Sequence, residues 1–170
     1  VDQGHFGPGV GGRREPGGYD AGGQHIPNYA VTASGGPYHW QAVDAYAQTV
    51  YTNGPKAGQY RGFGTAQAAF ATECALDELA ERLSIDPLEL RLKNTLRTGE
   101  IAFLGYPVAE TIGFTQVLEV LRPHYGLFRA EANMFNNEQA EVILSGAPQQ
   151  LAGRSRRIRA VGLAGMWYRF

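Results

Sequence analysis

The sequence has little of three features that would define a specialised class of protein. It contains one cysteine, Cys74, in 170 residues, so it can form neither an intrachain disulfide nor a cysteine-based zinc or iron–sulfur site. Its formal net charge of −1 provides no basic surface to attract nucleic acid. No apolar run approaches the roughly 20 residues that span a bilayer, and the first residues contain no apolar signal segment. We therefore expect a cytoplasmic protein without nucleic-acid contacts or a membrane span.

Glycine, in contrast, is abundant and unevenly placed. The chain has 23 glycines, and they are dense in residues 1–24. Because each glycine loses much backbone entropy when it is ordered, residues 1–23 are predicted to form no regular helix or strand. We expect a glycine-rich loop or tail over residues 1–24 and one folded domain, or part of one, over residues 25–170.

The strongest element prediction is a long helix directly after Gly64. Residues 65–83 contain no glycine or proline, and most are good helix formers. Helical spacing predicts one broad buried face, with Cys74 as a buried small residue. The apolar residues at this spacing are Ala66, Ala69, Phe70, Leu76, Leu79, Ala80 and Leu83. Asp86 then suits an N-cap, with Pro87 at the first helical position, so a second helix is predicted over residues 87–94.

The remaining segments are predicted to be mixed. Aromatic, small and β-branched residues in 37–52 favour one or two strands. Residues 99–113 are predicted to be a loop, and residues 114–121 a short helix that ends at Pro123. A further helix over 127–139 and a final strand over 158–170 complete the chain, which gives an α+β fold.

The segment YRGFGTAQ, residues 60–67, is the leading candidate site. It joins an extended segment to a helix N-terminus, where unpaired backbone N–H groups favour a bound anion. Gly62 and Gly64 would allow close approach to the backbone, and Arg61 could bind a phosphate or carbonyl group with its planar guanidinium. From the chemistry alone an alternative stays open, in which Arg61 is a solvated turn residue and Phe63 fills the core. The histidines at positions 5, 25, 39 and 124 lack the spacing of metal ligands, so we expect no metal site made of protein side chains.

Several spaced motifs in one order resemble the molybdopterin-binding subunit of the xanthine dehydrogenase/aldehyde oxidase family of molybdenum hydroxylases. The similarity extends from about residue 17 to the end of the chain. The matching residues are Val50-Tyr51-Thr52-Asn53, Arg61-Gly62-Phe63-Gly64, Gln67, Glu73, Asp86-Pro87, Glu89-Leu90-Arg91 and Asn94. The resemblance implies part of the molybdenum-cofactor-binding domain, with mixed strands and a long helix after the Arg61–Gly64 turn.

The resemblance also implies roles for the turn. Arg61, Gly62 and Gly64 would contact a molybdenum–molybdopterin cofactor, whose dinucleotide form is left open, and Phe63 would line the substrate pocket. The reaction would oxidise an aldehyde or an N-heteroaromatic substrate with water as the oxygen source. Electrons would leave through iron–sulfur clusters to FAD on partner subunits or domains.

The sequence departs from the family pattern at the catalytic base. In the family this base is a glutamate in a glycine-containing motif near the far C-terminal end of the subunit, and no such motif occurs here. Glu73, Glu78, Glu81 and Glu89 are better explained as helix-surface or capping residues, so the catalytic residue is unknown. We expect the chain to be inactive without further polypeptide of the molybdenum subunit. The alternative is a non-catalytic remnant or interaction module that keeps the fold without the metal.

Overall fold

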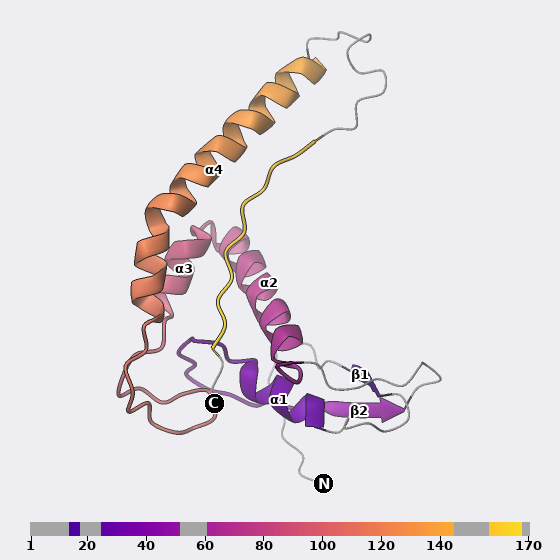
Figure 1. Ribbon diagram of the computed structural model, residues 1–170, viewed down its shortest axis with the longest axis vertical. Coiled ribbons are helices and arrows are strands. Elements are labelled where there is room, and N and C mark those ends of the chain that lie inside the picture. Colours follow the sequence, from indigo (N-terminus) through magenta and orange to yellow (C-terminus); the bar gives the residue numbers. More distant parts are fainter. Residues whose placement is uncertain (1–13, 18–24, 52–60, 145–156, 168–170) are drawn as a thin grey trace. The chain divides into compact units, whose positions relative to one another are not determined.

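A computed structural model of the chain describes residues 14–17, 25–51, 61–144 and 157–167 (Figure 1). Most of the predicted N-terminal loop over residues 1–24 lies outside these ranges, as do Thr52, Asn53 and Tyr60 of the family motifs. The chain divides into two compact units. One comprises Val1–Phe114 and Ala164–Phe170, and the other comprises Thr115–Leu163.

The two helices after the Arg61–Gly64 turn begin as the sequence predicts. Helix α2 spans Thr65–Leu83, and α3 spans Pro87–Lys93. The Asp86 carboxylate accepts hydrogen bonds from the backbone N–H of Leu88 at 2.9 Å and of Glu89 at 3.4 Å. This confirms the predicted N-cap, which satisfies donors that the first turn of a helix leaves free.

The predicted buried face of α2 is wrong in part. Phe70 is 69% exposed and Leu83 is 53% exposed, and Cys74 is also exposed rather than buried. The residues that α2 buries are Thr65, Ala68, Thr72, Glu73, Leu76 and Ala80. Polar residues occupy part of this face because hydrogen bonds satisfy them, which hydrophobic spacing alone does not detect.

Strand content is lower than the sequence predicts. Strands β1 (Arg14–Gly17) and β2 (Gln48–Tyr51) pair in parallel, with Arg14 opposite Gln48. The prediction that residues 1–23 contain no strand is therefore wrong for β1, whose backbone is stabilised by pairing with a segment distant in sequence. Residues 157–167 form no helix or strand, so the predicted strand is wrong over 158–167, while residues 168–170 of that prediction lie outside the described residues. Glycines interrupt this segment, and no described strand lies beside it to form a ladder.

Helix α1 (His25–Ala33) was not predicted and connects the two parallel strands in the chain order β1–α1–β2 (Figure 1). Parallel strands need a crossover of this kind because a tight hairpin cannot join them. Pro27 lies in the first turn of α1, where its missing N–H removes no helical hydrogen bond. The helix packs against α2 beside the Arg61–Gly64 turn.

Helix α4 (Phe114–Leu144) replaces the two separate helices predicted over 114–121 and 127–139. Pro123 lies inside it, so the prediction that Pro123 ends the helix is wrong. A proline removes one backbone hydrogen bond and crowds the preceding turn, but long helix-forming segments on both sides can outweigh that cost.

Farther along α4, Asn136 forms a pair of hydrogen bonds with the backbone of Arg159. Asn136 Nδ2 donates to the Arg159 carbonyl at 2.8 Å, and the Arg159 N–H donates to Asn136 Oδ1 at 2.9 Å.

Two small clusters of buried side chains lie among the described residues of the first unit. One contains Tyr38, Leu76, Ala80 and Leu90, with the partly buried Phe114 edge-on to Tyr38. The other contains Leu96, Ala102 and Val108, with the partly buried Trp167 against it. The predicted loop over residues 99–113 is confirmed in outline, since an isolated bridge between Ile101 and Pro107 is its only ladder contact among the described residues.

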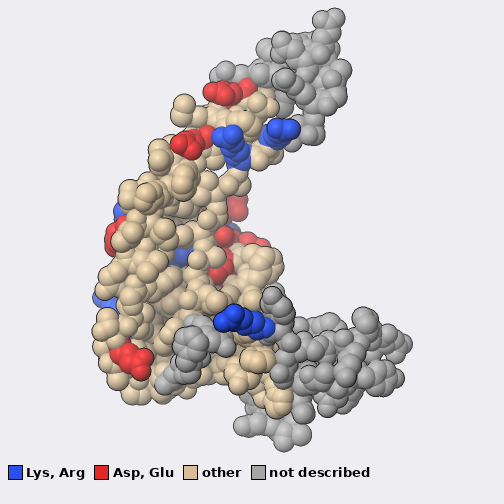
Figure 2. All heavy atoms as spheres, in the orientation of Figure 1, with Lys and Arg blue, Asp and Glu red and all other residues tan. Residues whose placement is uncertain are grey.

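Large apolar side chains remain exposed on both long helices. Besides Phe70 on α2, they include Val120 at 69% and Met134 at 64% on α4. On the face drawn in Figure 2, acidic and basic side chains are interspersed within a larger uncharged area. None of the helices in the described ranges combines the length and apolar character needed to cross a membrane.

Candidate functional site at the start of helix α2

The Arg61–Gly64 turn has an unusual backbone. Gly62, Phe63 and Gly64 all have positive φ, at 93°, 44° and 102°. The N–H of Thr65 donates to the Gly62 carbonyl at 2.8 Å, and the N–H of Ala68 donates to the Gly64 carbonyl at 3.0 Å, so the turn leads directly into α2. A phenylalanine rarely adopts positive φ, and strain of this kind concentrates at binding sites.

The two glycines of the turn have different surroundings. A Cβ atom on Gly64 would lie 2.6 Å from the Ile26 carbonyl oxygen and 3.1 Å from Ala30 Cβ, so Gly64 is required for the close packing of α1. A Cβ atom on Gly62 would have Thr65 Cβ, at 3.8 Å, as its nearest neighbour among the described residues. The backbone at Gly62 is therefore open to a bound group, whereas the missing side chain of Gly64 already has a structural reason.

Phe63 is half-buried and contacts an aromatic ring of α1. The centroids of Phe63 and Tyr29 are 5.4 Å apart, with the ring planes inclined by 35°. Tyr29 is 50% exposed, so this pair lies at the surface of the first unit and does not fill its core. One side of the Phe63 ring thus has a partner within the chain, and a role in substrate binding stays a prediction.

Arg61 is exposed, and no hydrogen bond or ion pair joins it to another residue in the part of the chain that the structure describes. The backbone N–H groups of Ala66 and Gln67, in the first turn of α2, have no backbone acceptor within the same ranges. A guanidinium, free N–H donors and an open glycine backbone are groups that can bind a bulky anionic cofactor. These residues fit the predicted molybdopterin cofactor, although no side chain of the turn is suited to ligate the metal itself. Within the described residues, no three His, Cys, Asp or Glu side chains cluster as metal ligands.

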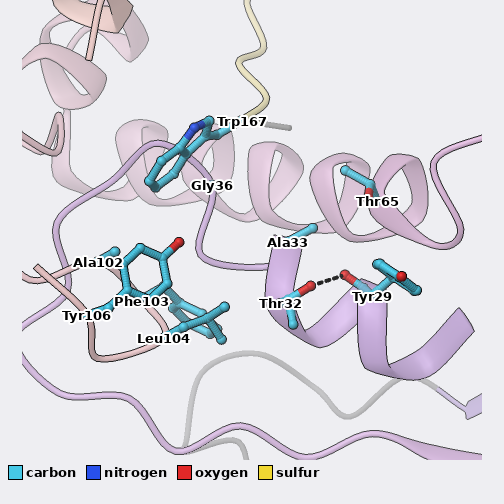
Figure 3. Close-up of a pocket in the computed structure, with 10 residues that line it drawn as sticks. All are labelled: Tyr29, Thr32, Ala33, Gly36, Thr65, Ala102, Phe103, Leu104, Tyr106 and Trp167. Carbon is cyan, nitrogen blue, oxygen red and sulfur yellow. Dashed lines mark hydrogen bonds between the residues drawn. The ribbon is translucent and has the colours of Figure 1, made fainter. Parts of the chain in front are cut away.

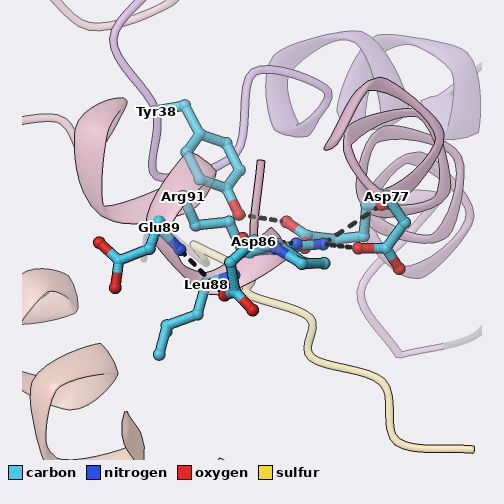
Figure 4. Close-up of polar contacts among 8 residues, drawn as sticks. Tyr38, Asp77, Asp86, Leu88, Glu89 and Arg91 are labelled. Carbon is cyan, nitrogen blue, oxygen red and sulfur yellow. Dashed lines mark hydrogen bonds and ion pairs between the residues drawn. The ribbon is translucent and has the colours of Figure 1, made fainter. Parts of the chain in front are cut away.

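A buried ionic network lies further along α2 (Figure 4). Arg91 of α3 is fully buried and donates from Nε to Glu73 Oε2 at 2.8 Å, while its Nη2 lies 2.8 Å from Asp77 Oδ1. The Tyr38 hydroxyl donates to Glu73 Oε1 at 2.6 Å. Burial, and then the hydrogen bond to Glu73, raises the pKa of Tyr38 far above its usual range.

The prediction that Glu73 lies on the helix surface is therefore wrong. Glu73 is 5% exposed, whereas Glu78 and Glu81 are exposed as predicted. Its spacing from Leu76 and Ala80 places it on the buried face of α2, and that spacing was the available signal. Since Glu73 is fully occupied by Tyr38 and Arg91, its role is to join α2 to α3 and to the segment at Tyr38.

The fold of the first unit also forms a pocket of about 260 Å³ (Figure 3). No sequence pattern signals it, because its walls come from segments that are separate along the chain. The residues that line the pocket are Tyr29, Thr32, Ala33, Gly36, Thr65, Ala102, Phe103, Leu104, Tyr106 and Trp167. Tyr29 belongs both to this pocket and to the contact with Phe63.

Comparison with known proteins shows which family the chain resembles. A family model described as "Molybdopterin cofactor-binding domain" matches residues 14–95, which contain the Arg61–Gly64 turn and the Glu73–Arg91 network. The chain is 37% identical over 107 residues to a probable xanthine dehydrogenase subunit of Bacillus subtilis, a match that covers 63% of this chain and 14% of that protein. Over this domain the chain is similar to the xanthine dehydrogenase/aldehyde oxidase family.

Further proteins of this molybdenum hydroxylase family are similar to the chain in sequence and fold. The xanthine dehydrogenase molybdenum-binding subunit of Escherichia coli O157:H7 is 51% identical over 78 residues, covering 44% of this chain and 10% of that protein. The solved structure of aldehyde oxidoreductase from Desulfovibrio gigas superposes with a TM-score of 0.66 at 32% identity, covering 70% of this chain and 13% of that chain. The fold is thus that of the cofactor-binding domain. The predicted mixture of strands is not confirmed, since the described residues are mostly helical and contain two short strands.

Proposed function

We propose that the protein supplies one wall of the cofactor pocket of a molybdenum hydroxylase, with Arg61, Gly62 and Gly64 at the cofactor and Phe63 on the substrate side. The observation that carries the proposal is the open turn at the start of α2, within the matched cofactor-binding domain. When bound, the cofactor would supply the redox chemistry that oxidises an aldehyde or N-heteroaromatic substrate, with water as the oxygen source. The chain's own residues bind and orient it.

Each residue of the turn has a distinct part in this proposal. The Arg61 guanidinium donates hydrogen bonds to oxygen atoms of the cofactor, and the first-turn N–H groups of α2 add the positive end of the helix dipole. Gly62 leaves space for the cofactor at the backbone. Gly64 lies at the cofactor as well, and its contact with α1 fixes the direction in which the turn enters α2.

The rest of the enzyme is also part of the proposal. The chain spans about a seventh of the length of the Bacillus subtilis relative, at 14%, so the full activity requires polypeptide beyond the matched region. We propose that further molybdenum-subunit polypeptide packs on the exposed apolar side chains of α2 and α4, and that iron–sulfur and FAD subunits or domains accept the electrons. A non-catalytic module is not favoured, because the relatives are named as dehydrogenase or oxidoreductase proteins.

The cofactor role of Arg61 can be tested by substitution. Loss of a charged hydrogen bond costs about 1.5–3 kcal/mol, so Arg61→Ala should weaken cofactor affinity roughly 10- to 100-fold. The measurement is the molybdenum and pterin content per mole of protein after purification from molybdate-grown cells. Helicity should be unchanged, because Arg61 is exposed.

Arg82→Ala is the matched control, since Arg82 is an exposed arginine in the last turn of α2, at the end of the helix far from Arg61. Its substitution should leave the molybdenum and pterin content unchanged. Equal cofactor content in the two variants would contradict the role of Arg61. Absence of both molybdenum and pterin from the folded wild-type protein would contradict the function itself.

A further inference from the structure

The pocket beside α1 is built largely from aromatic rings. Tyr29 comes from α1, Phe103 and Tyr106 come from the loop after α3, and Trp167 comes from the C-terminal segment (Figure 3). No acidic or basic side chain of the described residues contributes to its lining. Such walls favour apolar, flat ligands and offer no partner for a charged group.

The ring of Phe103 is held in place by its neighbours, so this wall exists before any ligand binds. Phe103 lies against the backbone at Gly35, where a Cβ atom would collide with its ring. Trp40 packs edge-on to Phe103, with the ring centroids 6.4 Å apart, and its indole N–H donates to the Gly35 carbonyl at 2.8 Å. Gly35 is itself positioned by α2, since the Thr72 hydroxyl donates to the adjacent Ser34 carbonyl at 2.8 Å.

Backbone hydrogen bonds also fix the loop that carries both Phe103 and Tyr106. The loop that carries Tyr106 is closed by backbone hydrogen bonds from Ala102 N–H to the Tyr106 carbonyl at 2.9 Å and from Gly105 N–H to the Ala102 carbonyl at 2.8 Å. Trp167 packs against the cluster that contains Ala102. A preformed pocket binds without the entropy cost of ordering its walls.

The size of the pocket limits its occupant. A dry cavity of about 150 Å³ can hold one benzene ring, whereas pockets for drug-sized ligands begin near roughly 300 Å³. At about 260 Å³, this pocket lies between those limits and suits one ring or two fused rings. Its few hydroxyl groups include that of Thr32, which already has a local acceptor in the Tyr29 carbonyl at 2.9 Å.

We propose that this pocket binds an uncharged planar molecule of one or two aromatic rings. The inference does not depend on bound molybdenum, because none of the lining residues is assigned to the cofactor. It adds a binding site next to the turn: Tyr29 forms one wall of the pocket and also contacts Phe63, so a ligand there would lie against the same tyrosine.

The test is a titration of the protein, purified from cells grown without molybdate, with indole as a neutral two-ring probe. Binding is measured by isothermal titration calorimetry and by saturation-transfer NMR. Indole should bind saturably, and indole-3-carboxylate should bind at least about tenfold more weakly because its charge would be buried without a partner. Since the cofactor is absent, failure here would leave the proposed role of Arg61 untouched, and loss of that role would not affect this result.

Two exposed lining residues allow substitution without removing core contacts. Thr32→Trp should fill the pocket and weaken indole binding at least tenfold, and Leu104→Ala should weaken it severalfold by removing part of a wall. Phe70→Ala is the control, because Phe70 is an exposed aromatic residue outside the pocket, and it should change affinity less than twofold. The proposal is overturned if indole does not bind the wild-type protein, if Phe70→Ala weakens binding as much as Thr32→Trp, or if the carboxylate binds as tightly as indole.

Discussion

Gly64 has two independent reasons to lack a side chain. Its φ of 102° is unfavourable for any other residue, and the Ile26 carbonyl of α1 occupies the space that a Cβ atom would need. At Gly99 only the first reason applies, because φ is 88° but no described atom lies within 4 Å of the Cβ position. Substitutions at these two glycines therefore separate the cost of backbone strain from the cost of close packing.

We predict that Gly64→Ala destabilises the protein more than Gly99→Ala does. Backbone strain should lower the free energy of unfolding of both variants by about 1–3 kcal/mol. Overpacking against α1 should lower that of Gly64→Ala by a further ~1–3 kcal/mol. The measurement is the free energy of unfolding in urea, followed by circular dichroism. Equal losses would show that α1 does not pack on the turn as described.

Among the residues of the candidate site, the sequence indicated Arg61, Gly62, Phe63 and Gly64 through the spacing of the motif. It did not reveal that Tyr29 contacts Phe63 or that the Ile26 carbonyl requires a glycine at position 64. Both facts depend on where α1 packs. A contact between segments that are distant in sequence leaves no periodic pattern in either of them.

At the scale of elements, α2 and α3 are joined by buried charges as well as by apolar contacts. Glu73 and Arg91 form an ion pair with side chains 6% and 0% exposed, whereas the pair of Glu78 and Arg82 on the same helix has side chains 72% and 78% exposed. Without the Glu73 charge, the buried Arg91 would keep only the half-exposed Asp77 as an ionic partner, in a medium of low dielectric. An exposed pair is replaced by water at little cost.

Glu73→Gln should therefore lower the free energy of unfolding by about 3–5 kcal/mol, and Glu78→Gln by less than about 1 kcal/mol. Both variants remove one negative charge from α2 and keep the size of the side chain. Their unfolding curves in urea, measured in the same buffer, give the comparison. If both cost less than about 1 kcal/mol, the ion pair with Asp77 alone would be enough to compensate Arg91, and Glu73 would not join α2 to α3 as described.

Local signals predicted α2 and α3 well, because the cap at Asp86 and the run without glycine or proline act within a few residues. The same kind of signal failed for α1, which is short and contains Pro27 as well as the β-branched Val31 and Thr32. It failed for β1 because its stability comes from pairing with β2. For α4, the local effect of Pro123 was overestimated relative to the long helical segments on either side.

At the scale of the whole molecule, the family assignment followed from the order of several motifs, which no single motif would have supported. The matched domain extends over residues 14–95 and therefore includes β1, α1 and β2, of which β1 and α1 left no recognisable pattern in the sequence. The exposed apolar side chains of α2 and α4 were also unexpected. They are the side chains on which we propose that further molybdenum-subunit polypeptide packs.

The most direct test of the cofactor role is a crystal structure of the protein with molybdenum and pterin bound, together with its remaining subunit polypeptide. We predict that the Arg61 guanidinium lies within hydrogen-bonding distance of a cofactor oxygen and that the cofactor passes over the backbone of Gly62. The first-turn N–H groups of α2 should face the same ligand. A cofactor bound elsewhere, with Arg61 in solvent or paired with a protein carboxylate, would contradict the proposed role.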